Sequence, residues 1–533
     1  MTAHQPHTRI TPGLADLPTE VDMVVIGLGV TGAGVALDAV SRGLTVLAVD
    51  AHDLAFGTSR FSSKLVHGGL RYLASGQVGI AHESAVERGI LMETTAPHLT
   101  RPLPSLIPLS AGVSRPMGTL AGAGFLGGDL LRRAAGTSAD TLPRPRRLSA
   151  AETRRLAPPL RTDGLRGAYL GWDGQLEDDA RLVTTIARTA ADRGAHVRTH
   201  ARVVSATGDS RLAGARTSTS EFSVTLKDEL TGATATVTTR TVVNAAGVWA
   251  GDLVDDVRLR PSRGTHLVLR AGTLPGLDVA VFAPIPGETN RFVLVLPQPD
   301  GQFYVGLTDE PVDGPIPDVA EPTEVEIGFL LDVVAASFAR PLRREDVVGA
   351  FAGLRPLLDS GDDSTADLSR KHAVLTSPTG IVTIVGGKLT TYRRMAEDAV
   401  DAAVGHARLT AGPCVTATLP LAGAAPRETL ADRAAKAGHP GEARLVRRYG
   451  ADADLALEAA VRASGWDQDQ LLAPIAEGIS TVWAELFFGV THEGAADVAD
   501  LLDRRTRIGL IPDDRALAVP AAEKVLEIVR GER

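Results

Sequence analysis

A glycine-rich turn near the N-terminus has the spacing that dinucleotide-binding proteins use. Gly27, Gly29 and Gly32 fit G-x-G-x-x-G directly after an apolar segment, residues 21–26, that is typical of a strand. Glycines here let the backbone turn tightly and approach a pyrophosphate, whose negative charge favours the N-terminus of the following helix. Asp50 ends the next apolar run, where its carboxylate can accept hydrogen bonds from ribose hydroxyls. The pattern predicts a dinucleotide site and leaves FAD and NAD as alternatives.

The strands and helices that must position this turn come from distant parts of the chain. Residues 241–247 and 381–387 repeat the strand-to-glycine transition, which predicts one parallel sheet, and a helical pattern then runs to about residue 404. Gly34 is expected to let the first helix pack closely on a strand. From about residue 410 onward the chain is rich in Ala, Leu and Arg and predicts a helical domain. Short apolar segments predict a separate, largely antiparallel sheet: residues 264–270, 291–296 and 302–307.

The composition is that of a globular protein. Hydrophobic residues make up 44% of the 533 residues, enough for roughly three compact domains. The formal charge of −9, without a basic run, argues against nucleic acid as a partner. Because Cys414 is the single cysteine, an intrachain disulfide and an iron–sulfur cluster are excluded. Clusters with metal-ligand spacing are not found in the sequence either, so no catalytic metal is expected.

The sequence also bears on location. Residues 1–20 lack the apolar segment of a secretory signal and are expected to be a flexible tail. No uncharged apolar run reaches about 20 residues, the length of a membrane-spanning helix. The shorter run at residues 117–131, MGTLAGAGFLGGDLL, could lie in a membrane surface or form a buried helix. We expect a cytoplasmic protein and leave open a peripheral contact with the inner face of the cell membrane.

Three separated segments resemble one known family. They look like the FAD-dependent, quinone-linked glycerol-3-phosphate dehydrogenases: residues 26–43 (IGLGVTGAGVALDAVSRG), 62–73 (SSKLVHGGLRYL) and 386–396 (GGKLTTYRRMA). The family usually has glycine where this chain has Leu28, a variable spacer within the turn. Weaker correspondences extend the resemblance over nearly the whole chain: residues 178–182, 244–247, 264–266, 353–357 and 502–510.

The resemblance implies an α/β fold of three parts. A glutathione-reductase-type FAD-binding domain would be interleaved with an antiparallel-sheet substrate domain over residues 21–408, and an α-helical C-terminal domain would follow over residues 409–533. The FAD part is expected at about 21–115, 170–255 and 345–408, and the substrate part at about 116–169 and 256–344.

The implied activity is oxidation of sn-glycerol 3-phosphate to dihydroxyacetone phosphate, with a hydride passing from C2 to N5 of non-covalently bound FAD. Such a substrate carries close to two negative charges, so its pocket should supply Arg or Lys donors. Arg71, Arg355 and Lys388 lie in matched motifs and are expected to bind it, with Arg370 as a further candidate. Tyr72 could hydrogen-bond the substrate. Structural ion pairs, or core packing for Tyr72, are the alternatives.

Removing the C2 hydroxyl proton calls for a base, and histidine is the natural candidate. We favour His266 as the base and as a substrate contact, with Arg355 and Lys388 as the other catalytic residues. His67 is expected to contact the flavin or the substrate, and a buried structural histidine is the alternative interpretation of both His266 and His67. The other expected cofactor contacts carry hydroxyls or lie in turns: Thr58, Ser59, Ser62, Ser63, Gly247, Gly386, Gly387, Leu389 and Thr390.

Several alternative functions are left open, and they differ in electron acceptor, in substrate, or in whether the protein is an enzyme. Membrane quinone is favoured over oxygen, which a related oxidase group uses, because no oxidase-specific insertion is evident. Another flavoenzyme of the amino-acid or amine oxidase class would bind a carboxylate or an amine, and several pocket arginines argue against an amine. A nucleotide-binding regulatory protein would keep the turn at Gly27 and need none of the cations. A homodimer is left open.

Overall fold

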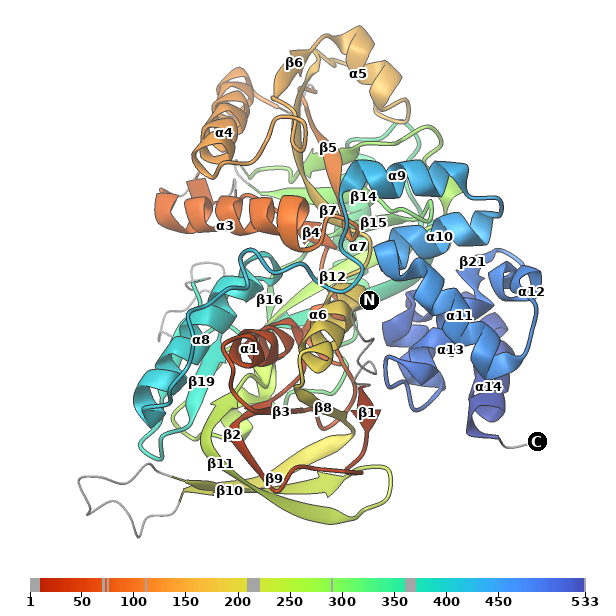
Figure 1. Ribbon diagram of the computed structural model, residues 1–533. Helices are drawn as coiled ribbons and strands as arrows, with labels where there is room; N and C mark the ends of the chain where they lie inside the picture. Colours follow the sequence, from red (N-terminus) through yellow and green to blue (C-terminus); the bar gives the residue numbers. More distant parts are fainter. Residues whose placement is uncertain are drawn as a thin grey trace.

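The computed structural model describes residues 10–69, 72–73, 76–110, 113–208, 221–288, 291–359 and 371–531. Two sheets with their covering helices lie one above the other, and a helical region lies beside them (Figure 1). The chain crosses between the two sheets several times before it enters the helical region.

The first sheet has a parallel centre that continues into an antiparallel edge. The parallel strands lie in the order β1 (Thr11–Pro12), β8 (His196–Thr199), β3 (Val46–Val49), β2 (Glu20–Ile26), β11 (Thr234–Asn244) and β19 (Val382–Val385). The antiparallel strands are β10 (Phe222–Asp228) and β9 (Ala201–Gly208) beyond β11, and β18 (Ala373–Thr376) beside β19. Strand β3 is apolar and buried at every residue, as is typical of a parallel strand covered on both faces.

Three helices cover one face of this sheet. Helix α1 (Val30–Ser41) lies between α6 (Asp179–Asp192) and α8 (Tyr392–Ala407) (Figure 1). A Cβ atom added to Gly34 would lie 2.9 Å from Cδ2 of Tyr392 on α8. Gly34 therefore permits a close contact between two helices, and the expected helix-to-strand contact was wrong.

The second sheet is mainly antiparallel. Its strands lie in the order β16 (Glu310–Pro311), β12 (Ser262–Leu269), β15 (Phe303–Gly306), β14 (Phe292–Pro297), β13 (Ala280–Pro284), β5 (Thr100–Pro108), β7 (Ala168–Leu176) and β4 (Leu65–Val66), with β17 (Val347–Arg355) on β12 and β6 (Arg146–Leu148) on β7. Helix α7 (Glu324–Ala335) packs on β12, β13 and β14 through a shared apolar core. The other helices of this region are α3 (Val78–Ile90), α4 (Arg115–Ala134) and α5 (Ala150–Leu156).

Sheet membership differs from the expected segment boundaries. Strands β4, β5, β7 and β17 belong to the second sheet, although they fall within or across the segments assigned to the FAD part. The periodicity of a strand reports which of its faces is buried and carries no information about which sheet it joins. The expected tail also differs, because Ile10 is buried and Thr11–Pro12 of β1 pair with β8 at the edge of the first sheet. Residues 1–9 lie outside the described residues.

The C-terminal region has its own apolar core. Its elements are α9 (Arg427–Lys436), α10 (Pro440–Tyr449), α11 (Ala453–Ser464), α12 (Gln468–Leu472), a hairpin of β20 (Pro474–Ala476) and β21 (Ile479–Val482), α13 (Trp483–Thr491), a π-helical segment at Asp500–Arg505, and α14 (Pro512–Arg530). This region agrees with the predicted helical domain.

Candidate active site

A cavity of about 980 Å³ lies where the two sheets meet. Its lining runs from the glycine-rich turn after β2, through the loop after β3, to one face of the second sheet and the loop before α8. Helix α7 covers the opposite face of the second sheet and does not contribute to this lining. We call the part of the cavity beside the glycine-rich turn and Asp50 the nucleotide end, and the part beside Arg355 and His266 the reaction end.

The glycine-rich turn has the steric form that its spacing predicts. Gly27 has φ +96°, and a Cβ atom there would lie 2.7 Å from the carbonyl oxygen of Ala245. A Cβ atom on Gly32 would overlap the carbonyl oxygen of Gly27. Gly29 is extended and lines the cavity, and α1 begins directly after it without a side-chain cap. Gly32 itself does not line the cavity, so its contribution is to the shape of the turn.

Asp50 lies at the nucleotide end of the cavity. Its carboxylate accepts hydrogen bonds from the Leu28 amide at 2.7 Å and from the His52 amide at 2.9 Å. Burial raises the pKa of Asp50, and these two backbone hydrogen bonds oppose the rise. Asp50 thus ties the glycine-rich turn to the loop after β3. Its predicted contact with ribose stays a prediction.

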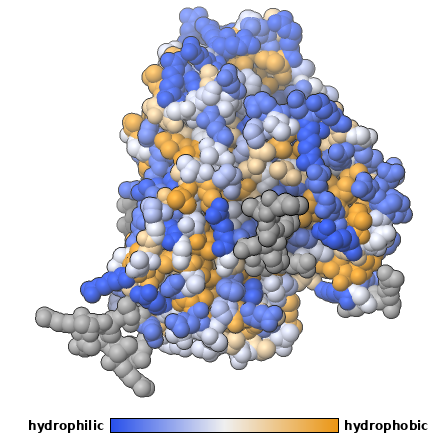
Figure 2. Space-filling view, viewed as in Figure 1, coloured by the Kyte–Doolittle hydropathy of each residue, from blue (hydrophilic) through white to orange (hydrophobic). Residues whose placement is uncertain are grey.

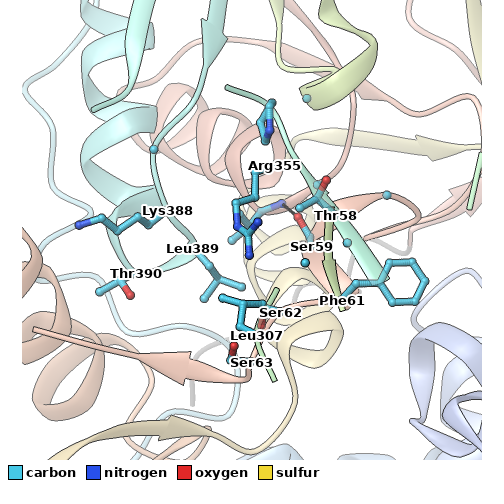
Figure 3. Close-up of a pocket in the computed structure, with 18 of the residues that line it drawn as sticks. Thr58, Ser59, Phe61, Ser62, Ser63, Leu307, Arg355, Lys388, Leu389 and Thr390 are labelled. Carbon is cyan, nitrogen blue, oxygen red and sulfur yellow. Dashed lines mark hydrogen bonds between the residues drawn. The ribbon is translucent and has the colours of Figure 1, made fainter. Parts of the chain in front are cut away.

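The predicted flavin contacts gather around the middle of the cavity, and their hydroxyls differ in direction (Figure 3). Ser59 accepts a hydrogen bond from the Val30 amide at 2.9 Å, whereas Thr58 donates to the carbonyl oxygen of Leu354 at 2.5 Å. Ser62 donates to Asp179 at 2.7 Å. The hydroxyl protons of Thr58 and Ser62 are therefore already donated within the protein. The remaining predicted contacts that line it are Ser63, His67, Gly247, Gly386, Gly387, Leu389 and Thr390.

Arg355 ends β17 at the reaction end of the cavity. Its guanidinium donates to Asp309 at 3.0 Å, to the hydroxyl of Ser262 at 3.1 Å and to the carbonyl oxygen of Thr308 at 3.0 Å. A Cβ atom on Gly264 would overlap this guanidinium, so the glycine makes room for it. The three bonds fix the side chain in a half-buried position from which it lines the cavity.

His266 lies on β12 next to Arg355. Its Nε2 atom is 2.9 Å from the hydroxyl of Ser63, and its ring stacks on Phe351 at 4.9 Å between centroids. Burial, together with the positive charges of Lys64 and Arg355, lowers the pKa of His266 to about 3. The imidazole is therefore neutral at physiological pH, which is the form able to accept a proton.

The other predicted substrate residues that the structure describes, Lys388 and Tyr72, line the cavity without directing a charged group at Arg355 (Figure 3). The Lys388 ammonium donates to the Ser84 hydroxyl at 2.6 Å and lies 3.7 Å from the centroid of the Tyr72 ring. Figure 3 shows this side chain pointing away from Arg355. Lys388 and the buried Tyr72 both line the cavity, but the ammonium is directed toward α3. Arg71 and Arg370 lie outside the described residues.

Two acidic residues that support the site were not expected from the sequence. Asp309 holds Arg355, and Asp179 accepts hydrogen bonds from Ser62 and from the buried ammonium of Lys64, at 2.9 Å. Asp179 lies in residues 178–182, which resemble the family, and this resemblance is the sequence signal that could have identified it. Asp309 follows β15 in a loop without a motif, so no sequence signal pointed to it.

Two further findings concern metals and membranes. Among the described residues, no group of three His, Cys, Asp or Glu side chains could hold a metal ion. Across the part of the chain that the structure describes, no helix is both long enough and apolar enough to cross a bilayer.

The sequence matches two family models that divide the chain as the sheets and the helical region do. Residues 22–393 match the model described as FAD dependent oxidoreductase, and residues 414–533 match the C-terminal domain of alpha-glycerophosphate oxidase. The match confirms the predicted fold class and FAD as the cofactor.

Relatives and solved structures agree with these models. The chain is 51% identical over 510 residues to glycerol-3-phosphate dehydrogenase 1 of Mycobacterium tuberculosis, covering 95% of each chain. It is 38% identical over 527 residues to glycerol-3-phosphate dehydrogenase 2 of the same organism, covering 96% of this chain and 84% of that one. The glycerol-3-phosphate dehydrogenase from Bacillus halodurans complexed with FAD superposes with a TM-score of 0.71 at 28% identity, covering 96% and 92%.

Proposed function

Because the chain belongs to the family of FAD-dependent glycerol-3-phosphate dehydrogenases, we propose that it oxidises sn-glycerol 3-phosphate to dihydroxyacetone phosphate and passes the electrons to membrane quinone. The observation that carries the substrate assignment is the pairing of a fixed arginine, Arg355, with a neutral histidine, His266, at the reaction end of the cofactor cavity. A phosphate needs a cation, and a secondary alcohol that loses a hydride needs a proton acceptor.

The residues of the cavity suit FAD. The turn from Gly27 to Gly32 has no Cβ atoms at its glycines, which allows a pyrophosphate to approach the N-terminus of α1. Gly386 and Gly387, with φ of +77° and +72°, form a second turn close to where α8 begins. Bound FAD supplies a two-electron acceptor for a hydride from carbon. The pyrophosphate would be held by the first turn, and the ring system by the loops around Ser63 and Gly386.

Arg355 is proposed to bind the substrate phosphate. Its bonds to Asp309, Ser262 and Thr308 set the plane of the guanidinium before the substrate arrives, which lowers the entropy cost of binding. A planar guanidinium also suits bidentate contact with phosphate oxygens. Lys388 is proposed as a second cation at the edge of this site, and it would have to leave its contact with Ser84 to reach the substrate.

His266 is proposed to accept the proton of the C2 hydroxyl. A pKa of about 3 makes it a weak base in the empty cavity, because burial and the charges of Lys64 and Arg355 disfavour the imidazolium. A bound phosphate dianion would offset these charges and raise the pKa of His266. The proton acceptor would thus strengthen only when substrate is present. The hydrogen bond between Ser63 and Nε2 orients the ring for this role.

Quinone as the acceptor is supported by the surface of α4. Leu120, Leu126 and Leu130 project from this helix with exposed fractions of 56%, 64% and 64%. Met117, Leu120 and Phe125 of the same helix also line the cavity, so apolar surface extends from the outside of α4 into the reaction end. Figure 2 shows hydrophobic residues at the surface in the region of α4, at the upper left. An apolar entrance of this kind fits a lipid-soluble acceptor and peripheral contact with a membrane.

Oxygen is the second candidate acceptor, because the C-terminal region matches a domain described for alpha-glycerophosphate oxidase. Both candidates share the reduction of the flavin by the substrate, and they differ in which acceptor reoxidises the reduced flavin.

The test separates the two half-reactions. Anaerobic mixing of the holoenzyme with sn-glycerol 3-phosphate is expected to bleach the absorbance of oxidised flavin, and the enantiomeric sn-glycerol 1-phosphate is the control. An unbleached flavin would refute the proposed substrate. The bleached enzyme is then mixed with oxygen or with a short-chain quinone. Faster reoxidation by the quinone supports the dehydrogenase, and faster reoxidation by oxygen supports the oxidase.

A further inference from the structure

The loop between β3 and the 3-10 turn at Thr58–Arg60 forms one wall of the nucleotide end of the cavity. His52 and Phe56 of this loop stack at 3.9 Å between ring centroids with an interplanar angle of 11°, and both line the cavity. The Ala55 amide donates to the carbonyl oxygen of Leu28 at 3.0 Å. Residues 51–57, which we call the wall loop, are therefore attached on one side to the glycine-rich turn.

The other side of the wall loop is attached to the C-terminal domain. Asp53 is fully buried, and its carboxylate accepts hydrogen bonds from Arg504 Nε at 2.6 Å and from both terminal nitrogens of Arg505 at 2.7 Å. The Arg504 guanidinium also lies 5.7 Å from the centroid of the Phe56 ring. One carboxylate of the wall loop thus accepts hydrogen bonds from two arginines, and both arginines lie about 450 residues further along the chain.

The two arginines are themselves held by the C-terminal domain and by the first sheet. Arg505 donates to the carbonyl oxygen of Glu493 at 2.7 Å, and Arg504 pairs with Asp500. Asp500 also lies 3.1 Å from Nε2 of His200, whose backbone amide donates to the carbonyl oxygen of His52 at 2.5 Å. The charges of Asp53 and Asp500 balance those of the two arginines within a buried cluster.

We propose that Arg504 and Arg505 are positioning residues for FAD: through Asp53 they hold the wall loop against the nucleotide, so the C-terminal domain controls how tightly the cofactor is retained. A carboxylate bound bidentately by one arginine and also by a second can occupy only a narrow range of positions. The stacked rings of His52 and Phe56 are closely connected to it, since His52 adjoins Asp53 and the Phe56 amide donates to the carbonyl oxygen of Asp53 at 3.3 Å. The proposal depends on the cofactor and does not depend on the substrate.

The chain offers a control in a second contact of the C-terminal domain. Asp514 of α14 binds Arg270, which follows β12, through both carboxylate oxygens, at 2.8 and 2.6 Å. Asp514 and Arg270 do not line the cavity. Asp53→Asn and Asp514→Asn therefore each remove one negative charge from an arginine–carboxylate contact between the C-terminal domain and the rest of the chain, and only the first contact touches the wall loop.

The experiment measures the FAD dissociation constant by flavin fluorescence and the melting temperature of each apoprotein. Asp53→Asn is expected to raise the dissociation constant at least 10-fold, and Asp514→Asn to change it less than 3-fold, even where both apoproteins melt at lowered temperatures. An unchanged constant in Asp53→Asn, or an equal rise in both variants, would overturn the proposal.

A milder variant covers the case in which Asp53→Asn does not fold. Arg504→Lys keeps the positive charge and leaves the two bonds from Arg505 to Asp53 in place, but it removes the planar guanidinium beside Phe56. We expect a rise of about 3- to 10-fold in the FAD dissociation constant. A constant equal to that of the unaltered protein would count against the proposal as firmly as the first result.

Discussion

Replacing Gly29 by alanine tests how closely the cofactor's pyrophosphate approaches the backbone. Gly29 has φ −70° and ψ −176°, a conformation that alanine adopts without strain. An added Cβ atom would meet a single neighbour within 4 Å, the hydroxyl oxygen of Ser59 at 3.0 Å, and a serine side chain can move by a few tenths of an ångström. The variant is therefore expected to fold, with a methyl group standing in the cavity where Gly29 lines it.

The size of the effect follows from the bond that the methyl group would obstruct. A hydrogen bond between a backbone amide and a charged phosphate oxygen contributes about 1.5–3 kcal/mol. Losing one such bond corresponds to a rise of roughly 10- to 150-fold in the FAD dissociation constant. By contrast, Gly32→Ala would place its methyl group on the carbonyl oxygen of Gly27, so that variant is expected to lose the turn itself.

The assay is a titration of apoprotein with FAD, followed by flavin fluorescence. Gly405→Ala is the control, because Gly405 lies in α8 with open space around its added Cβ atom and does not line the cavity. Alanine in a helix stabilises by up to about 1 kcal/mol, so the control should bind FAD as before and melt no earlier. A Gly29→Ala protein that binds FAD unchanged would refute the placement of the pyrophosphate.

Three further predictions concern substrate, pH and membrane. Arg355→Met is expected to raise KM for sn-glycerol 3-phosphate roughly 10- to 100-fold with unchanged FAD content, and a parallel loss of FAD would contradict its role at the phosphate. His266 has a pKa of about 3 when folded and about 6.5 when unfolded, so its contribution to stability is intact above pH 6.5 and is lost as the pH falls toward 3, by at most about 5 kcal/mol. Urea unfolding of His266→Gln should accordingly depend less on pH over that range, and an identical dependence would contradict the low pKa. The double variant Leu126→Glu, Leu130→Glu should sediment less with anionic lipid vesicles than the unaltered protein does. Val325→Glu, which alters an 82% exposed residue on α7, is the control and should sediment as the unaltered protein does. Equal sedimentation of all three proteins would argue against α4 as the membrane contact.

The parts of the fold that depend on local sequence were predictable. The turn at Gly27, the strand before it and the helix after it have their signal within about 20 residues, because strand periodicity, glycine spacing and helix periodicity are all short-range properties. Asp50 could be predicted for the same reason. The structure places it at the cavity, with its carboxylate on the Leu28 amide.

The parts that depend on distant contacts were not predictable. Strand β17 has the same apolar pattern whichever sheet it joins, and only its pairing with β12 decides the matter. The bond between Arg355 and Asp309 joins the end of β17 to the loop after β15, and the two sequences do not reveal that they meet. Lys388 was predicted from its motif, but a motif does not determine a rotamer, and the ammonium lies on Tyr72 and Ser84.

The interleaving of the two sheets has a consequence for how the protein is made on the ribosome. Val24 pairs with Val242, and Val243 pairs with Val382, so the parallel sheet cannot be completed until most of the chain has been synthesised. Pairings so distant in sequence form slowly, and chains of this size pass through partly folded states that expose apolar surface. A nascent chain that ends before residue 382 would lack the strand beside β11 and the loop around Gly386. The cavity that is proposed to hold the flavin is therefore completed only after residue 382 has been synthesised, so we expect the nascent chain to be more than two-thirds complete before it can bind the cofactor.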